Sequence, residues 1–381
     1  MFLDLSKAFD TLDHNILLKK LAFYGVRGVA FEWFRSYLEN RLQFTKYKSA
    51  SSQRLEITCG IPQGSILGPL LFTLYINDLP KICNSCSPIL FADDTNLLFS
   101  GRDLPTLINE INSQLNLLSQ WFILNKLSLN VSKTKFILFT SQHNTPIPNR
   151  DLIINGEVIE SVDSIKFLGV IIDKNFKWKE HISHKCNTIA KTLSVFTRIR
   201  HFIPTEILKV LYHSLITPHL TYGIVAWGMM DTKESKRLSI LQKRAIRLMA
   251  NCKYNAHTGP LFKLHNLYTI DDIFKIQCGK LLVNRLKSKL PQYLINLLPI
   301  SDSTHSYNTR TPYIIRPHII NSSYRKQHLS YKLYNLYNEL PDSLKNKISC
   351  SPHTFKRYQK RLYNSQYSSQ CEIRNCYICQ T

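Results

Sequence analysis

Apolar positions along the first 175 residues switch repeatedly between helical and strand-like spacing. Helical spacing covers residues 16–24, 29–38 and 104–127, and the first of these stretches ends at Gly25. Runs of strand composition lie at residues 42–47, 55–58, 136–139, 152–154 and 170–172. Such a mixture of short strands and amphipathic helices predicts an α+β domain.

From residue 181 to about residue 252 the pattern becomes helical throughout. Within residues 234–249 the apolar side chains form one stripe, and basic side chains occupy much of the remaining helix surface. The stripe consists of Leu238, Leu241, Ala245 and Leu248; Lys236, Lys243 and Arg247 lie opposite it, and Arg237 and Arg244 lie on its flank. A solvated basic face and a phosphate-binding face both fit this arrangement.

Two adjacent acids interrupt an apolar stretch at residues 88–99. Asp93 and Asp94 stand between two runs of strand composition, which predicts a hairpin whose turn carries both carboxylates. Their repulsion is about 1 kcal/mol in water and about 4 kcal/mol at the dielectric of a protein surface, so the pair needs compensation. Hard oxygen ligands suit Mg²⁺ or Mn²⁺. A solvated hairpin tip fits the same residues, because Asp is common in turns.

A third acid interrupts the apolar strand at the start of the chain. Asp4 follows Phe2 and Leu3, and a lone Asp in a buried strand is unfavourable unless it is paired or bound to metal. Three carboxylates from two strand elements can hold two Mg²⁺ ions roughly 4 Å apart, which is the arrangement used for nucleotidyl transfer. The alternative is that Asp4 ends its strand in water.

A glycine-containing loop, residues 60–65, runs into an apolar helix that extends to about residue 79. Gly60 and Gly64 allow the backbone to approach a ligand closely, and Ser65 can cap the helix. The loop lacks the Lys-Ser/Thr ending of a P-loop, which argues against ATP binding of that type. A tight turn without a ligand also fits the glycines.

The order of these three segments resembles the palm of a reverse transcriptase, in particular that of non-LTR (LINE-type, jockey-like) retrotransposons. The resemblance is carried by Phe2-Leu3-Asp4-Leu5-Ser6-Lys7-Ala8-Phe9-Asp10, Gly60-Ile61-Pro62-Gln63-Gly64-Ser65-Ile66-Leu67-Gly68-Pro69 and Phe91-Ala92-Asp93-Asp94. It implies a right-hand polymerase palm at residues 1–175, a helical thumb at 176–252 and a basic, mostly helical nucleic-acid-binding region at 253–381.

The resemblance also implies a role for individual residues. Asp4, Asp93 and Asp94 match the metal-binding aspartates, Phe9 the steric gate against a 2′-hydroxyl, Gln63 and Gly64 the loop at the templating and incoming nucleotides, Lys133 the general acid, and Phe167, Leu168 and Gly169 the primer grip. Lys236, Arg237, Lys243, Arg244 and Arg247 fall in the thumb, which holds template-primer duplex. Implied cofactors are two Mg²⁺ ions, or Mn²⁺, and implied partners are an RNA template, a DNA primer and dNTPs.

The chain starts at the first of these motifs, so we expect the fingers to be largely missing and the chain to be truncated at its N-terminus. The first hypothesis is an RNA-directed DNA polymerase that transfers a nucleotide from a dNTP to a primer 3′-hydroxyl. The second is a catalytically inactive retrotransposon remnant that still binds nucleic acid.

Charge is distributed unevenly along the chain. Residues 1–182 contain 19 Lys and Arg against 17 Asp and Glu, whereas residues 183–381 contain 30 against 9, which gives net charges of +2 and +21. A basic surface kept for solubility would explain the sign of the charge but not this asymmetry. The asymmetry favours a polyanionic partner bound mainly by the second half.

The ten cysteines are irregularly spaced and follow no secretory signal, so we interpret them as reduced thiols of an intracellular protein. A nuclear location is expected if the protein acts at chromosomal targets. Cys83 and Cys86, and the trio Cys371, Cys376 and Cys379, each supply fewer than the four ligands of a structural zinc site. The one long uncharged segment, residues 210–230, is too polar for a membrane span.

Overall fold

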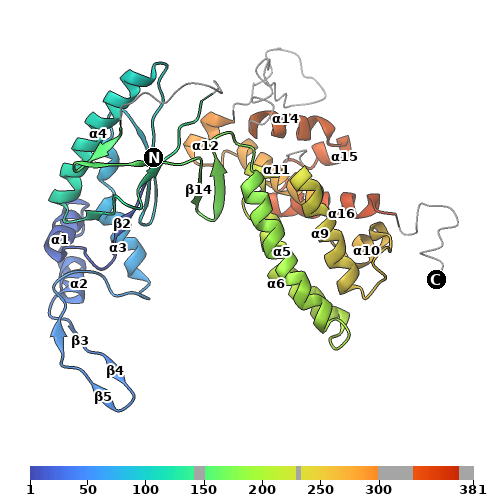
Figure 1. Cartoon of the computed structure of the whole chain (residues 1–381), viewed down its shortest axis with the longest axis horizontal. Helices are drawn as coiled ribbons and strands as arrows, with labels where there is room; N and C mark the ends of the chain where they lie inside the picture. The colour runs from blue at the N-terminus through green and yellow to red at the C-terminus, as the bar shows by residue number, and fades with distance from the viewer. Residues whose placement is uncertain (141–150, 229–232, 299–328, 369–381) are drawn as a thin grey trace. The chain divides into compact units, whose positions relative to one another are not determined.

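The computed structural model describes residues 1–140, 151–228, 233–298 and 329–368 (Figure 1). The chain divides into two compact units, Met1–Ile165 and Lys166–Thr381. The first unit mixes strands and helices and the second is mostly helical, which confirms the α+β class and the helical C-terminal part. The finer division at residues 175 and 252 stays a prediction. The trio of cysteines after residue 370 lies outside the described residues.

A five-stranded sheet forms the centre of the first unit. Its strand order is β13 (Glu160–Ser161), β10 (Lys135–Phe136), β1 (Phe2–Leu3), β8 (Asp94–Leu98) and β7 (Ser87–Phe91). All neighbours are antiparallel except β10 and β13. The strand predicted at residues 136–139 is shorter than expected, because β10 pairs with two strands that are themselves only two residues long.

Helices α1 (His14–Phe23), α2 (Gly28–Leu38), α3 (Leu67–Ile76) and α4 (Leu104–Leu124) supply most of the core beside this sheet, and the short 3-10 helix η1 (Leu79–Ile82) follows α3. The predicted helices at 16–24, 29–38 and 104–127 are therefore confirmed, with small differences at their ends. Asp13 begins α1 by accepting a hydrogen bond from the backbone of Ile16. The buried aromatic residues of this core include Phe72, Tyr75 and Trp121.

The remaining strands of this unit form separate two-stranded pairs. These are β2 (Leu5–Ser6) with β9 (Ser128–Leu129), β3 (Leu42–Gln43) with β6 (Leu55–Glu56), β4 (Lys46–Tyr47) with β5 (Ala50–Ser51), and β11 (Ile153–Ile154) with β12 (Glu157–Val158). The turn between β4 and β5 lies at Lys48 and Ser49. Tyr47 pairs with Ala50, and Lys48 adopts the positive φ of +54° that this tight connection requires.

The second unit is built around one helical core. The hairpin of β14 (Ser164–Phe167) and β15 (Val170–Asp173) precedes it. Its helices are α5 (Lys179–Ile199), α6 (Thr205–Leu215), α7 (Thr217–Thr221), α8 (Ile224–Trp227), α9 (Lys233–Met249), α10 (Thr258–His265), α11 (Ile270–Leu286), α12 (Gln292–Leu297), α14 (Leu329–Glu339), α15 (Asp342–Lys345) and α16 (Pro352–Gln366). Phe196, Trp227, Phe262, Phe274 and Phe355 all belong to the same buried cluster. The helices before and after residue 252 therefore share a core.

Among the described residues, no helix is both long enough and apolar enough to cross a membrane.

Candidate functional site

The adjacent acids lie on a tight hairpin, as the sequence predicts. Strands β7 and β8 pair in register up to Phe91 and Asp94, so Ala92 and Asp93 form a two-residue turn. Ala92 has a φ of +51°, a conformation that is strained for a residue with a side chain. This turn holds the Asp93 carboxylate at the tip and leaves Asp94 as the first residue of β8.

Strand pairing brings the third acid to the same end of the sheet. Leu3 pairs with Thr95 across β1 and β8, and Phe2 pairs with Asn96. Continuing this antiparallel register by one residue sets Asp4 opposite Asp94. Asp4 and Asp94 therefore lie across from each other where β1 ends and β8 begins, and Asp93 lies on the adjoining turn.

The electrostatics of this end of the sheet reflect that proximity. Burial, then the negative charges of Asp93 and Asp4, raise the pKa of the Asp94 carboxyl. Among the described residues, no three His, Cys, Asp or Glu side chains are grouped closely enough to hold a metal ion as they stand. The donor chemistry nevertheless fits Mg²⁺ or Mn²⁺, because the three groups are hard oxygen ligands whose charges already interact.

Lys133 lies beside Asp4, in a turn that the chain builds locally. The Lys133 ammonium is 3.9 Å from the Asp4 carboxylate and remains largely exposed. The backbone N–H of Asn130 donates to the Asp4 carbonyl at 2.8 Å, and the Asp4 N–H donates to the Thr134 hydroxyl at 3.3 Å. These bonds fix the turn against β1, so Lys133 and Asp4 keep their proximity.

Phe9 is held between α3 and the loop at residues 60–65. Its ring lies 4.7 Å from the ring of Phe72, centroid to centroid, and its carbonyl accepts a hydrogen bond from Ile61 at 2.9 Å. Gly60 has a φ of +84°, and a Cβ there would lie 2.7 Å from the Asp10 carbonyl oxygen. The first and second motifs therefore pack backbone against backbone, which requires glycine at this position.

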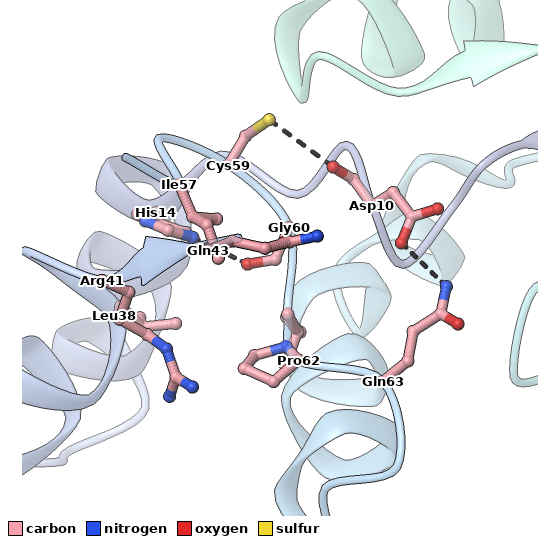
Figure 2. A pocket seen from close by; sticks show the side chains of 11 residues that line it. Asp10, His14, Leu38, Arg41, Gln43, Ile57, Cys59, Gly60, Pro62 and Gln63 are labelled. Carbon is pink, nitrogen blue, oxygen red and sulfur yellow. Dashed lines mark hydrogen bonds between the residues drawn. The ribbon is translucent and has the colours of Figure 1, made fainter. Parts of the chain in front are cut away.

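A cavity of about 500 Å³ opens beside this contact (Figure 2). Its apolar lining comes from Leu38, Ile57, Ile61 and Pro62, and its polar lining from Asp10, His14, Arg41, Gln43, Cys59, Gly60 and Gln63. The Gln63 amide donates to the Asp10 carboxylate at 2.9 Å, and a ring nitrogen of buried His14 lies 2.7 Å from the Gly60 carbonyl. Sequence reasoning gave Gln63 a role but missed Asp10, His14 and Arg41. Asp10 stands next to Phe9 in the first motif, which is the only sequence signal for it.

Phe167, Leu168 and Gly169 form the tip of the β14–β15 hairpin in the second unit. Leu168 and Gly169 have positive φ angles of +44° and +79°. The Tyr222 hydroxyl donates to the Leu168 carbonyl at 2.5 Å, and the Lys185 ammonium lies 5.8 Å from the centre of the Tyr222 ring. The tip is therefore anchored to the helices that follow it.

His181 provides a second anchor for this hairpin. Its Nδ1 accepts a hydrogen bond from the Ile171 N–H at 3.2 Å. Burial, then the charges of Lys185 and His184, lower the pKa of His181 to about 4. The imidazole is therefore neutral near pH 7 and can act as an acceptor.

The basic residues of α9 divide into two groups. Lys236, Arg237, Lys243 and Arg244 are exposed, while Leu238, Ala245 and Leu248 of the predicted stripe are buried and Leu241 is half-buried. Arg247 is less exposed than the sequence pattern predicts. It is half-buried, and its Nε donates to the Ala256 carbonyl at 2.6 Å, because the chain turns back along α9 after residue 249.

The expected nucleic-acid contacts of the last part of the chain are only partly within the described residues. Phe355 is fully buried in the helical core, so its ring supports packing. Tyrosine also alternates with basic residues at 305–310 and 324–326, and both of these segments lie outside the described residues.

The predicted site residues thus fall into two sets. The first unit brings together Asp4, Asp93, Asp94 and Lys133, and it joins Phe9 to the loop of Gln63 and Gly64. The second unit contains the Phe167–Leu168–Gly169 tip and the basic residues of α9.

Comparison with known proteins points in the same direction. Residues 1–172 match the family described as reverse transcriptase (RNA-dependent DNA polymerase). The chain is 26% identical over 288 residues to the probable RNA-directed DNA polymerase from transposon BS of Drosophila melanogaster, an alignment that covers 71% of this chain and 31% of that protein. It is 26% identical over 279 residues to the corresponding polymerase from transposon X-element of Drosophila melanogaster, which covers 71% of this chain and 30% of that protein.

A third relative is the RNA-directed DNA polymerase from mobile element jockey of Drosophila funebris, 24% identical over 269 residues, with 68% of this chain and 29% of that protein covered. The chain spans about a third of the length of these relatives. Residues 1–172 thus match the reverse transcriptase family, and the chain is related to the jockey-like polymerases of non-LTR retrotransposons.

Proposed function

We propose that this chain carries the catalytic palm of an RNA-directed DNA polymerase, which joins a deoxynucleotide to a primer 3′-hydroxyl on an RNA template. One observation supports this proposal above the others. The register between β1 and β8 sets Asp4 opposite Asp94, with Asp93 on the adjoining turn, and the pKa of Asp94 responds to both neighbours.

In this proposal Asp4, Asp93 and Asp94 hold two Mg²⁺ ions, or Mn²⁺, which when bound activate the 3′-hydroxyl and neutralise charge on the leaving phosphates. Lys133 exchanges its ion pair with Asp4 for the triphosphate and gives a proton to the leaving pyrophosphate. Phe9, fixed against Phe72, lies under the incoming sugar and excludes a 2′-hydroxyl.

Other residues position the substrates. Gln63 and Gly64 meet the templating and incoming nucleotides, and the tip formed by Phe167, Leu168 and Gly169 supports the primer end. Exposed Lys236, Arg237, Lys243 and Arg244 contact duplex phosphates. Arg247 contributes less, because its guanidinium already binds the Ala256 carbonyl. Action at chromosomal targets would put the protein in the nucleus.

Primer extension on an RNA template with Mg²⁺ or Mn²⁺ tests the proposal. The native chain and an Asp103→Asn variant should extend the primer, because Asn replaces Asp well as the cap of α4. Asp93→Ala should abolish extension. Equal extension by the native chain and Asp93→Ala would overturn the assignment.

The second candidate is a nucleic-acid-binding protein without polymerase activity. The absence of a ready metal-binding group among the described side chains favours it. It predicts salt-dependent binding of primer-template with no extension under any metal condition.

A further inference from the structure

A long hairpin arm, residues 42–56, contains strands β3, β4, β5 and β6 and projects beyond α1 and α2 (Figure 1). Every residue of the arm is exposed. The backbone of Ile57 donates to the Arg41 carbonyl at its root, and Thr45 and Ser52 exchange hydrogen bonds halfway along it. An isolated two-stranded hairpin is marginally stable in water, so an arm of this kind suits a binding role.

The arm exposes aromatic side chains in a hairpin that has no core of its own. Phe44 is 49% exposed and Tyr47 is 72% exposed. Leu42 and Leu55 nearer the root are exposed as well. Several exposed apolar side chains on one short arm indicate an interaction surface.

The charges of the arm indicate the kind of partner. The arm carries three basic residues, Lys46, Lys48 and Arg54, against one acid, Glu56, which lies at its root. The Lys48 ammonium lies 5.5 Å from the centre of the Tyr47 ring, and the Arg54 guanidinium lies 5.7 Å from that of Phe44. Each ring therefore has a cation beside it. Stacking surfaces paired with cations are the combination that binds single-stranded nucleic acid.

The root of the arm leads into the cavity beside the second motif. Arg41 and Gln43 line that cavity from the arm, and Gln63 lines it from the opposite wall (Figure 2). The Arg41 guanidinium lies 5.3 Å from the centre of the Tyr37 ring. The cavity lining combines amides, a carboxylate and a guanidinium with apolar side chains, and this combination suits a nucleobase with its phosphate. Its volume of about 500 Å³ accommodates one nucleotide.

We propose that the arm binds the unpaired part of the RNA template, with one template nucleotide in the cavity at its root. This inference rests on the proposed function, because the cavity wall contains the Gln63 that is expected to meet the template. From residue 42 to the turn the arm extends about 20 Å. That length spans several consecutive nucleotides of a single strand.

A single strand fits the arm better than a duplex does. The faces of paired bases are covered by their neighbours, whereas unpaired bases can stack on Phe44 and Tyr47. A duplex would contact only the basic side chains of the arm, Lys46, Lys48 and Arg54.

Fluorescence anisotropy with an unstructured, labelled RNA of about 15 nucleotides, and with the same RNA in a duplex, tests the inference without metal or dNTP. The double variant F44A/Y47A should weaken binding of the single strand at least about tenfold and change duplex binding less than about twofold. The control F23A removes another exposed aromatic side chain of the first unit and should leave both affinities unchanged.

The cations are tested separately. The triple variant K46S/K48S/R54S should reduce the slope of log affinity against log salt by about 2 for the single strand. Unchanged single-strand affinity in F44A/Y47A, or equal losses with strand and duplex, would overturn the inference. A shift in self-association of F44A/Y47A by sedimentation, with RNA binding unchanged, would show that a second copy occupies the arm and would also overturn it.

The same assay separates this inference from the polymerase proposal. Asp93→Ala should bind the single strand as the native chain does. If Asp93→Ala and the native chain extend a primer equally while F44A/Y47A loses RNA binding, the polymerase assignment is wrong but the RNA-binding role of the arm is supported.

Discussion

The Lys133 ammonium lies 3.9 Å from the Asp4 carboxylate, although the two residues are far apart in sequence. The turn at residues 130–134 creates this proximity through its backbone bonds to Asp4. In the proposed site this cation leaves the Asp4 carboxylate for the incoming triphosphate. In the proposed mechanism Lys133 therefore has two roles: it pairs with Asp4 in the free protein and donates a proton to the leaving pyrophosphate.

Replacing Lys133 by Met should lower the rate of nucleotide addition by about a factor of 100, in the range of general acid catalysis. Binding of primer-template should stay within about twofold. The matched control is Lys135→Met, since Lys135 pairs with Glu160 at 2.5 Å on the sheet. Single-turnover extension measures both variants, and equal rates for Lys133→Met and the native chain would remove Lys133 from the mechanism.

The raised pKa of Asp94 predicts a pH-dependent gain in stability for Asp94→Asn. Between the unfolded and the higher folded pKa the native state binds more protons, so stability falls as the pH rises through that window. Asp94→Asn should therefore be more stable than the native chain at pH 7 and equally stable at pH 3. Urea unfolding at the two pH values measures the difference.

Asp103 serves as the comparison, because its pKa is lowered and its contribution to stability therefore changes with pH in the opposite direction. Hydrogen bonds from Thr106 lower the pKa of Asp103, so its contribution is present above the unfolded pKa and is lost as the pH falls. Asp103→Ala should be less stable than the native chain at pH 7 and approach it at pH 3. A gain for Asp94→Asn that is equal at both pH values would contradict the raised pKa of Asp94.

Gly60→Ala should destabilise the first unit by about 3 kcal/mol or more, through steric overlap added to backbone strain. Its Cβ would lie 2.7 Å from the Asp10 carbonyl oxygen at a φ of +84°. Gly64→Ala is the matched control, since its φ is +80° and no atom lies within 4 Å of the added Cβ. It should lose only about 1–2 kcal/mol. Equal losses in urea unfolding would show that the contact with Asp10 is unimportant.

Acidification should destabilise the second unit through His181. The unfolded pKa is about 6.5 and the folded pKa about 4, so the unfolded chain binds more protons in this window and stability is lost as the pH falls through it. The loss should reach about 3 kcal/mol. His181→Gln should flatten this dependence, while His201→Gln, at an exposed position, should not. Identical profiles for the two variants would exclude His181 as the cause.

Local patterns predicted much of this fold. Helical spacing located α1, α2 and α4, because apolar residues recur along one side of each helix. The paired acids predicted the β7–β8 hairpin, since its strands are adjacent in sequence and their register follows from the turn.

Long-range contacts could not be predicted in the same way. Asp4 faces Asp94 only because β1 pairs with β8, and no local pattern specifies that partner. The sequence pattern predicts that Arg247 lies on the exposed basic face of α9. In the structure its guanidinium instead donates to the Ala256 carbonyl of the loop that follows α9. The cavity likewise combines Asp10, Arg41 and Gln63 from three separate segments.

We propose that Asp4, Asp93 and Asp94 together form a metal site, and a Mn²⁺ titration followed by electron paramagnetic resonance measures binding at that site. The native chain and Asp103→Asn, each with primer-template and dNTP bound, should take up Mn²⁺ equally. Asp4→Asn and Asp93→Asn should lose that binding while keeping their fold by circular dichroism. Mn²⁺ binding that is the same in all four proteins would show that these acids do not form a metal site.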